Sequence, residues 1–399
     1  MDEKQRKITT LAVVVLSSFL TPYLSQSINT AMPSIGVDFS IDPILLSWIT
    51  NIYLLTAVMF LIPFGKIADI YGRRKIFIAG IAVIMLSTFL AGMSTSIGFL
   101  IFSRAMQGVG SAMVFSTGMA LLTTAYPLSE RGKILGINSA AVYMGQSMGP
   151  FLGGFLTEQL GWRSIFLTTA MICLVTIVLA YWKLADSGVR RNEERFNYIS
   201  SLIYSISLLV LVYGFSIVPE LASYLLIAAG LLGLVFFIRR ESKLTNPLIH
   251  VNLFLKNRVF AFSNLAVLIN FSATAAVVFL MSLYLQYILG LSPQYAGLVL
   301  VCKPVVQGIS SPIAGRLSDR FEPRILASLG MGFIAIGLFF LSFLTASTSL
   351  PLIIFFLIIV GLGISLFASP NSNAIMSSVD EKLYGLSSAT IGTMRLTGQ

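Results

Sequence analysis

Long apolar runs separated by short polar segments repeat along the whole chain. Twelve runs of bilayer-spanning length lie between Lys7 and Val379, and a thirteenth begins near Tyr384. A helix rises about 1.5 Å per residue, so about 20 apolar residues cross a hydrocarbon core roughly 30 Å thick. The pattern therefore predicts an all-α polytopic membrane protein with spans over residues 8–32, 45–66, 76–94, 98–124, 134–157, 164–182, 197–218, 221–238, 259–286, 294–315, 324–345 and 350–376.

Composition and charge agree with a lipid environment. The 399 residues are 56% hydrophobic and 11% charged, whereas soluble domains carry about 25% charged residues. The net charge of +10 resides in alternate loops, and Arg163 is the exception on the other side. Basic loops face the cytoplasm, so we expect a protein of the cell membrane with a cytoplasmic N-terminus and no nucleic-acid partner.

No motif for covalent chemistry is present in the sequence. Cys173 and Cys302 lie in apolar runs without CxxC or Cys/His spacing, and no GxxxxGK[ST] pattern occurs. We expect a protein that is not an enzyme and has no cofactor and no metal site.

An internal repeat divides the chain. Gly65–Asp69 at the end of the second span recurs as Gly315–Asp319 at the end of the tenth. Repeated six-helix halves are typical of secondary transporters, whose substrate sites lie between the halves. We expect a six-helix bundle over residues 1–183, two inserted helices with linkers over 184–257, and an incomplete second bundle over 258–399, truncated in helix thirteen.

The loop over Gly65–Lys75 resembles the signature between helices two and three of the major facilitator superfamily. Two further segments narrow the resemblance, because Arg104–Ala112 is similar to the motif of proton-coupled members and Gly145–Gly154 to the antiporter motif. Completing the second six-helix bundle would give fourteen spans in all. On this count the chain resembles the fourteen-span drug:proton antiporters. The resemblance implies a major facilitator fold, with two six-helix bundles and two inserted central helices, and a cytoplasmic gate formed by Gly65, Asp69, Gly72, Arg73, Arg74, Gly315 and Asp319.

The antiporter motif combines close helix packing with a proline at which the helix can kink. Gly145, Gly149 and Gly153 are spaced four apart and present a smooth face, Pro150 lacks a backbone donor, and Gly154 follows in register. This face can form a hinge or seal between the halves, and generic packing of small residues is the alternative reading.

Polar residues inside spans are candidates for a substrate cavity. Arg104, with Gln107 on its helical face, needs a protein partner or a wet cavity, unless it reaches the outer headgroups. Lys303 lies about 20 Å from Arg316, near the membrane midplane. A lysine facing the cavity would admit anionic or zwitterionic substrates, and a lysine satisfied by neighbouring carbonyls is the alternative. The remaining candidates are amides, which can equally serve as contacts between helices: Gln26, Asn29, Gln146 and Gln307.

One departure from the resembled family bears on coupling. Members often carry an aspartate in the first helix, at a place where this chain has Tyr23–Ser27. The acidic residues of this chain lie near loop ends instead. The resemblance implies a monomeric exporter of drugs or other amphipathic small molecules that works by alternating access with protons as the coupling ion. An exporter of one metabolite, lipid or peptide is the alternative, which Lys303 and the missing acid favour; a non-transporting receptor or assembly factor is a third reading.

Overall fold

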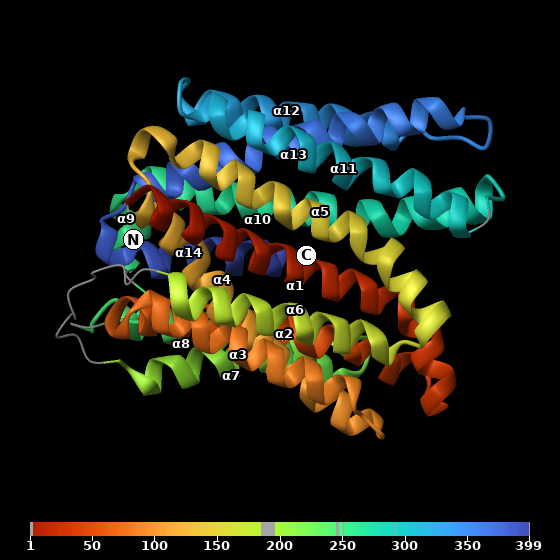
Figure 1. Ribbon diagram of the computed structural model, residues 1–399, viewed down its shortest axis with the longest axis horizontal. Helices are drawn as coiled ribbons and strands as arrows, with labels where there is room; N and C mark the ends of the chain where they lie inside the picture. The colour runs from red at the N-terminus through yellow and green to blue at the C-terminus, as the bar shows by residue number, and fades with distance from the viewer. Residues whose placement is uncertain (1–2, 185–195, 245–246, 250, 292, 399) are drawn as a thin grey trace.

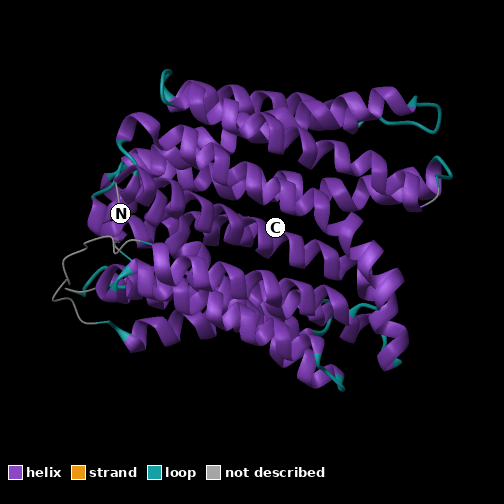
Figure 2. Cartoon of the chain, in the orientation of Figure 1, coloured by secondary structure: helices purple, strands orange, loops and turns teal. Residues whose placement is uncertain are grey.

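The protein is a bundle of long helices with loops gathered at two ends (Figures 1 and 2). The computed structural model describes residues 3–184, 196–244, 247–249, 251–291 and 293–398, and no strand occurs in these ranges. The helices of the N-terminal part are α1 (Glu3–Phe39), α2 (Pro43–Tyr71), α3 (Arg73–Gly92), α4 (Ile97–Ala125), α5 (Leu128–Leu160) and α6 (Arg163–Lys183). They are followed by α7 (Tyr198–Ser216), α8 (Leu221–Glu241), α9 (Val251–Lys256), α10 (Arg258–Leu283), the π-helix η1 (Tyr284–Ile288), α11 (Pro293–Ser318), α12 (Pro323–Leu341), α13 (Leu350–Ser377), the 3₁₀-helix η2 (Glu381–Leu383) and α14 (Tyr384–Gly398).

Eleven of the described helices are long and apolar enough to cross a membrane, which confirms the all-α polytopic prediction. The predicted end of the first span at residue 32 is wrong, because α1 continues through Pro33 to Phe39. The extension is held by packing, since Ile28 and Ile35 are buried in one cluster with Trp162 and Phe166 at the start of α6.

Polar side chains set several helix starts. Asp42, Ser96, Asn197 and Asn257 each accept the backbone N–H three residues ahead and so cap α2, α4, α7 and α10. Gly72 separates α2 from α3 with φ of +108°, a conformation that residues with a Cβ rarely adopt. Short polar segments therefore fix where each apolar run begins.

The packing has two-fold pseudo-symmetry. α5 packs against α1, and α14 packs in the same way against α10. We call α1–α6 the N-terminal half and α10–α14 the C-terminal half. α5 of the N-terminal half also packs on α11, and α14 of the C-terminal half also packs on α2. The helices α7 and α8 pack on each other, and α7 also contacts α2.

Candidate functional site

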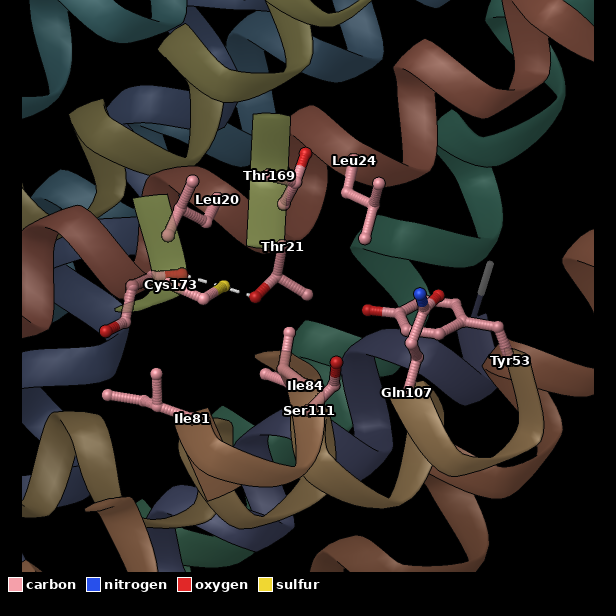
Figure 3. A pocket seen from close by; sticks show the side chains of 11 residues that line it. Leu20, Thr21, Leu24, Tyr53, Ile81, Ile84, Gln107, Ser111, Thr169 and Cys173 are labelled. Atoms are coloured by element: carbon pink, nitrogen blue, oxygen red, sulfur yellow. Dashed lines mark hydrogen bonds between the residues drawn. The ribbon is translucent and has the colours of Figure 1, made fainter. Parts of the chain in front are cut away.

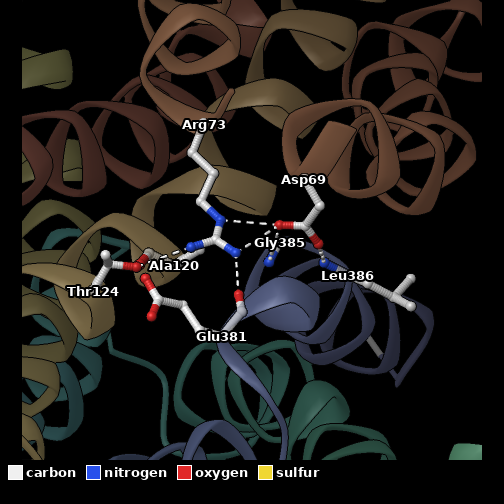
Figure 4. Close-up of polar contacts among 7 residues, drawn as sticks. All are labelled: Asp69, Arg73, Ala120, Thr124, Glu381, Gly385 and Leu386. Atoms are coloured by element: carbon white, nitrogen blue, oxygen red, sulfur yellow. Dashed lines mark hydrogen bonds and ion pairs between the residues drawn. The ribbon is translucent and has the colours of Figure 1, made fainter. Parts of the chain in front are cut away.

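Asp69, near the end of α2, contacts the first residues of α14. Its carboxylate accepts the backbone N–H groups of Gly385 and Leu386, each at 2.9 Å (Figure 4). The first N–H groups of a helix have no partner within the helix and favour a negative charge, so Asp69 caps α14. We name this set of interactions the α2–α14 contact.

Arg73 completes the α2–α14 contact. Its guanidinium pairs with Asp69 at 2.9 Å and donates to the hydroxyl of Thr124 on α4, also at 2.9 Å. It also donates to the carbonyl of Glu381 just before α14. Arg73 is fully buried and Asp69 is 3% exposed, so this ion pair is shielded from water.

Asp319 occupies the pseudo-equivalent position after α11. Its carboxylate accepts the N–H groups of Gly132 at 2.7 Å and Lys133 at 2.8 Å, near the start of α5. Partial burial raises the pKa of the Asp319 carboxyl, while these two donors lower it. We name this set the α5–α11 contact, and among described residues it contains no ion pair of Asp319.

Glycines bring the helices together at both contacts. A Cβ on Gly65 would lie 2.6 Å from the Cβ of Ala389, and one on Gly315 would lie 2.2 Å from the carbonyl oxygen of Gly132. Both contacts lie at the end of the bundle that holds the N-terminus, here called the basic end (Figure 1). Arg131 joins them, because its guanidinium lies 5.3 Å from the ring centroid of Tyr384.

Arg74 lies apart from these contacts, although the sequence grouped it with Arg73. Its guanidinium donates to the carbonyl of Tyr181 on α6 at 2.8 Å, on the periphery of the N-terminal helices. The other residues of the expected gate, Gly65, Asp69, Arg73, Gly315 and Asp319, meet the opposite half directly, and Gly72 shapes the turn between α2 and α3.

Arg104 lies inside the N-terminal helices. It is 1% exposed, donates to the carbonyl of Ile49 at 2.9 Å and to Oε1 of Gln107 at 2.5 Å, and lies 4.5 Å from the ring centroid of Tyr53. Gln107 in turn donates to Thr88 on α3 at 3.0 Å. Of the readings left open by the sequence, the structure supports a protein partner and not an extension to the headgroups.

A small cavity adjoins this cluster (Figure 3). It has a volume of about 20 Å³ and is lined by residues of α1, α2, α3, α4 and α6, among them Thr21, Tyr53, Gln107 and Ser111. This volume fits about one water molecule, whereas drug-sized ligands need roughly 300–1,000 Å³. The cavity lies within one half and is therefore distinct from a substrate chamber between the halves.

The glycines of the antiporter motif pack against α1. A Cβ on Gly145 would lie 2.4 Å from the carbonyl oxygen of Phe19, and one on Gly153 would lie 2.5 Å from Cα of Ser27. Gly149 lies against the same helix, and its carbonyl accepts the Ser27 hydroxyl at 2.9 Å. This face joins two helices of the same half, so it is not itself a seal between the halves.

The motif's last two members differ from these three glycines. A Cβ on Gly154 would meet only Thr30, at 3.6 Å, which is ordinary van der Waals contact. Pro150 lies inside α5, which continues as one helix to Leu160.

The remaining cavity candidates are dispersed over several helices. Gln26 and Gln146 are half-buried, and Asn29 is exposed and accepts the Thr50 hydroxyl at 3.1 Å. Gln307 is buried, and its carbonyl accepts the hydroxyl of Ser365 on α13 at 3.2 Å, a contact within the C-terminal part. Lys303 is half-buried on the same side of α11 as Gln307.

Arg395 on α14 is a polar residue that the sequence reasoning missed. It is half-buried, its Nε is buried without a hydrogen-bond partner, and its guanidinium lies 5.1 Å from the ring centroid of Phe271 on α10. Tyr143 of α5 and Tyr53 of α2, both in the other half, are its electrostatic neighbours. The internal repeat could have indicated Arg395. The thirteenth predicted span, which is α14, is the counterpart of the fifth, α5, which carries the antiporter motif.

Arg163, the basic residue on the otherwise uncharged side, has a local partner. Its guanidinium pairs with Asp38 at 2.8 Å and donates to the carbonyl of Ser94 at 3.0 Å. Its charge is thus paired with a carboxylate at the end of α1.

Comparison with known proteins identifies the family. The family model of the Major Facilitator Superfamily matches residues 14–399. The chain belongs to the major facilitator superfamily. The solved structure of the proton:xylose symporter XylE agrees, with a TM-score of 0.73, 14% identity, and coverage of 100% of this chain and 87% of that one. The predicted major facilitator fold is therefore confirmed.

Curated relatives of this superfamily member include a riboflavin transporter and a multidrug resistance protein. The riboflavin transporter RibZ of Clostridioides difficile is 29% identical over 391 residues, covering 98% of this chain and 85% of that protein. The multidrug resistance protein Stp of Mycobacterium tuberculosis is 27% identical over 398 residues, covering 98% of this chain and 74% of that protein. Membership in a superfamily of transporters supports transport of a small molecule across a membrane.

Proposed function

We propose that this protein is a secondary active exporter of amphipathic small molecules that works by alternating access. The carrying observation is the pair of contacts at the basic end, where Asp69 and Asp319 each hold the start of a helix from the opposite half. Breaking both contacts separates the halves at that end, which is the motion that alternating access requires.

In this proposal the basic end faces the cytoplasm, the N-terminus lies there, and the two contacts form the cytoplasmic gate. The excess of Lys and Arg in the loops of that end supports this orientation. The two bundles, residues 1–183 and 258–399, rock about a site between them, and the hairpin of α7 and α8 stays beside α2.

Protons are the proposed coupling ion, and drugs or similar amphipathic compounds are the proposed cargo. The similarity to the multidrug resistance protein Stp supports the cargo, and the motif over Arg104–Ala112 supports the coupling. Export of one metabolite is the second candidate, because RibZ is a riboflavin transporter and the first helix of this chain has no acid among Tyr23–Ser27.

The test is substrate-stimulated proton flux in proteoliposomes with an internal pH dye, using cationic, neutral and anionic compounds together with riboflavin. Flux with several unrelated compounds supports multidrug export, and flux with riboflavin alone supports the second candidate. Substrate uptake that ignores an imposed pH gradient would remove proton coupling but leave transport. Silence across the whole panel, relative to empty liposomes, would favour a receptor or assembly role.

A further inference from the structure

Basic side chains lie deep within the helices of this protein, whereas acidic ones do not. Every Asp and Glu in the described helices longer than one turn lies within two residues of a helix end. Arg104 and Lys303 lie well inside α4 and α11, and Arg395 lies eleven residues after the start of α14, in the last turn of that helix. Within the described helices, these three cations therefore lie deeper in the membrane region than any carboxylate.

Arg104 donates two hydrogen bonds within its own half, although its Nη2 is buried without a partner, whereas Arg395 donates none to a described residue. Among described residues the Arg395 guanidinium has no ion pair or hydrogen bond, and its Nε is buried. It lies eleven residues beyond Tyr384, about 16 Å along α14 from the basic end, which places it near the midplane. An arginine stays protonated at this depth, so its charge is costly unless an anion or water meets it.

Lys303 adds a second unbalanced charge at a similar depth. It lies thirteen residues before Arg316, or about 20 Å from the basic end of α11. No described residue forms a hydrogen bond or ion pair with its ammonium group. Both cations thus come from the C-terminal half and lie at the level where a transporter of this fold meets its cargo.

Arg395 has aromatic side chains among its neighbours. Phe271 of α10 lies under the guanidinium, and Tyr53 and Tyr143 of the N-terminal half are electrostatic neighbours of this charge. Tyr143 is 4% exposed and packs in one cluster with Val360 and Ile364 of α13, so it lies at the junction of the halves. A planar guanidinium binds a carboxylate through two parallel hydrogen bonds, and rings beside it suit an aromatic ligand body.

We propose that the exported substrate is an amphipathic organic anion with an aromatic body, whose anionic group is bound by Arg395, while Lys303 at a similar depth on α11 adds a second positive charge to the C-terminal half. Export of this anion rests on the proposed function, whereas binding of the anion is argued from Arg395 and its neighbours alone. Like charges repel strongly in a low dielectric, so a cation of the same shape is disfavoured.

The experiment compares fluorescein with rhodamine 123, which share a xanthene core and differ in charge sign. Binding to the purified protein is measured by fluorescence anisotropy for the natural chain, Arg395→Gln and Arg395→Lys. Arg324→Gln, which removes an exposed arginine at the start of α12, is the matched control. We expect tighter binding of fluorescein, a loss of about tenfold or more in Arg395→Gln, and near-normal binding in Arg395→Lys and the control.

Rhodamine 123 binding should stay unchanged or tighten in Arg395→Gln, which separates a charge effect from a folding defect. If Arg395→Gln does not elute as a folded species, Lys303→Gln replaces it and should weaken fluorescein selectively by about threefold or more. A preference of the natural chain for rhodamine 123, no binding of fluorescein, or an equal loss of both dyes in a folded variant would overturn the site.

Transport of the same dyes in proteoliposomes distinguishes this site from the proposed function. Selective fluorescein binding without transport would leave the anion site standing and refute export. Transport of rhodamine 123 that ignores Arg395 would leave export standing and refute the anion site.

Discussion

The α2–α14 contact should be much stronger than its pseudo-symmetric partner, and paired substitutions measure the difference. Asp69→Asn removes a buried charge that holds two N–H groups of α14 and pairs with Arg73. Asp319→Asn removes a half-buried charge that holds two N–H groups of α5. The two changes are chemically identical, so the surroundings decide the outcome.

The magnitudes follow from what each carboxylate loses. Removing one partner of a buried ion pair costs about 3–5 kcal/mol, because the other charge is left unbalanced. Arg73 keeps Thr124 and the Glu381 carbonyl, so we take about 3 kcal/mol for Asp69→Asn. Weakening two charge-assisted hydrogen bonds near water costs about 1–1.5 kcal/mol for Asp319→Asn. Open-to-closed ratios should therefore rise by about 100-fold and about tenfold, since 1.4 kcal/mol is a factor of ten.

The assay is double electron–electron resonance between spin labels on the two halves at the basic end. Tyr71 and Phe321 are exposed by 54% and 58% and lie outside the helix contacts that open, and Cys173 and Cys302 are first replaced by alanine. The population at long distance should grow more for Asp69→Asn than for Asp319→Asn. Equal growth in both variants, or greater growth for Asp319→Asn, would refute the reasoning from burial and ion pairing.

Three further predictions use matched changes. Gly132→Ala should weaken the α5–α11 contact by about 1–3 kcal/mol and raise the long-distance population in the same assay, because its Cβ would lie 2.5 Å from a carbonyl of α11; Gly98→Ala meets nothing within 4 Å and should have no effect. Gly153→Val should lower the thermal unfolding midpoint by forcing α5 from α1, whereas Gly154→Val, with one neighbour at 3.6 Å, should be tolerated. Arg104→Lys should also lower that midpoint, since an ammonium cannot replace the two hydrogen bonds and the ring contact together; an unchanged midpoint would contradict that view of its site.

The fold was largely predictable because the lengths and starts of its helices depend on residues that are close together in the sequence. Apolar runs of fixed length report the membrane, and the helix starts carry residues such as Asp42 and Asn257 that satisfy free N–H groups. The echo of Gly65–Asp69 in Gly315–Asp319 also led to two contacts at one end of the molecule. Because the motif occurs twice in the sequence, the same structural role could be inferred for both copies.

Partners across the molecule could not be predicted, since they depend on which helix faces which. Arg73 and Arg74 are neighbours in sequence, yet one turns to α14 and the other to α6. Gly145 and Gly153 were expected between the halves, but they meet α1 because α5 crosses from α11 to α1 along its length. Helical spacing indicates which residues share a face and leaves open what lies opposite.

Because the two contacts differ in strength, we expect the basic end to open in two steps. If the α5–α11 contact is weaker by about 1.5–2 kcal/mol, the state with that contact broken first is populated about 10- to 30-fold more often than its counterpart. Arg131 then matters, because it lies next to Gly132 of one contact and over the Tyr384 ring of the other. In the proposed cycle, release of α5 from Asp319 would move Arg131 away from Tyr384 and so remove a cation from the start of α14. We infer that the halves separate in sequence, with the α2–α14 contact, held by its buried ion pair, breaking last.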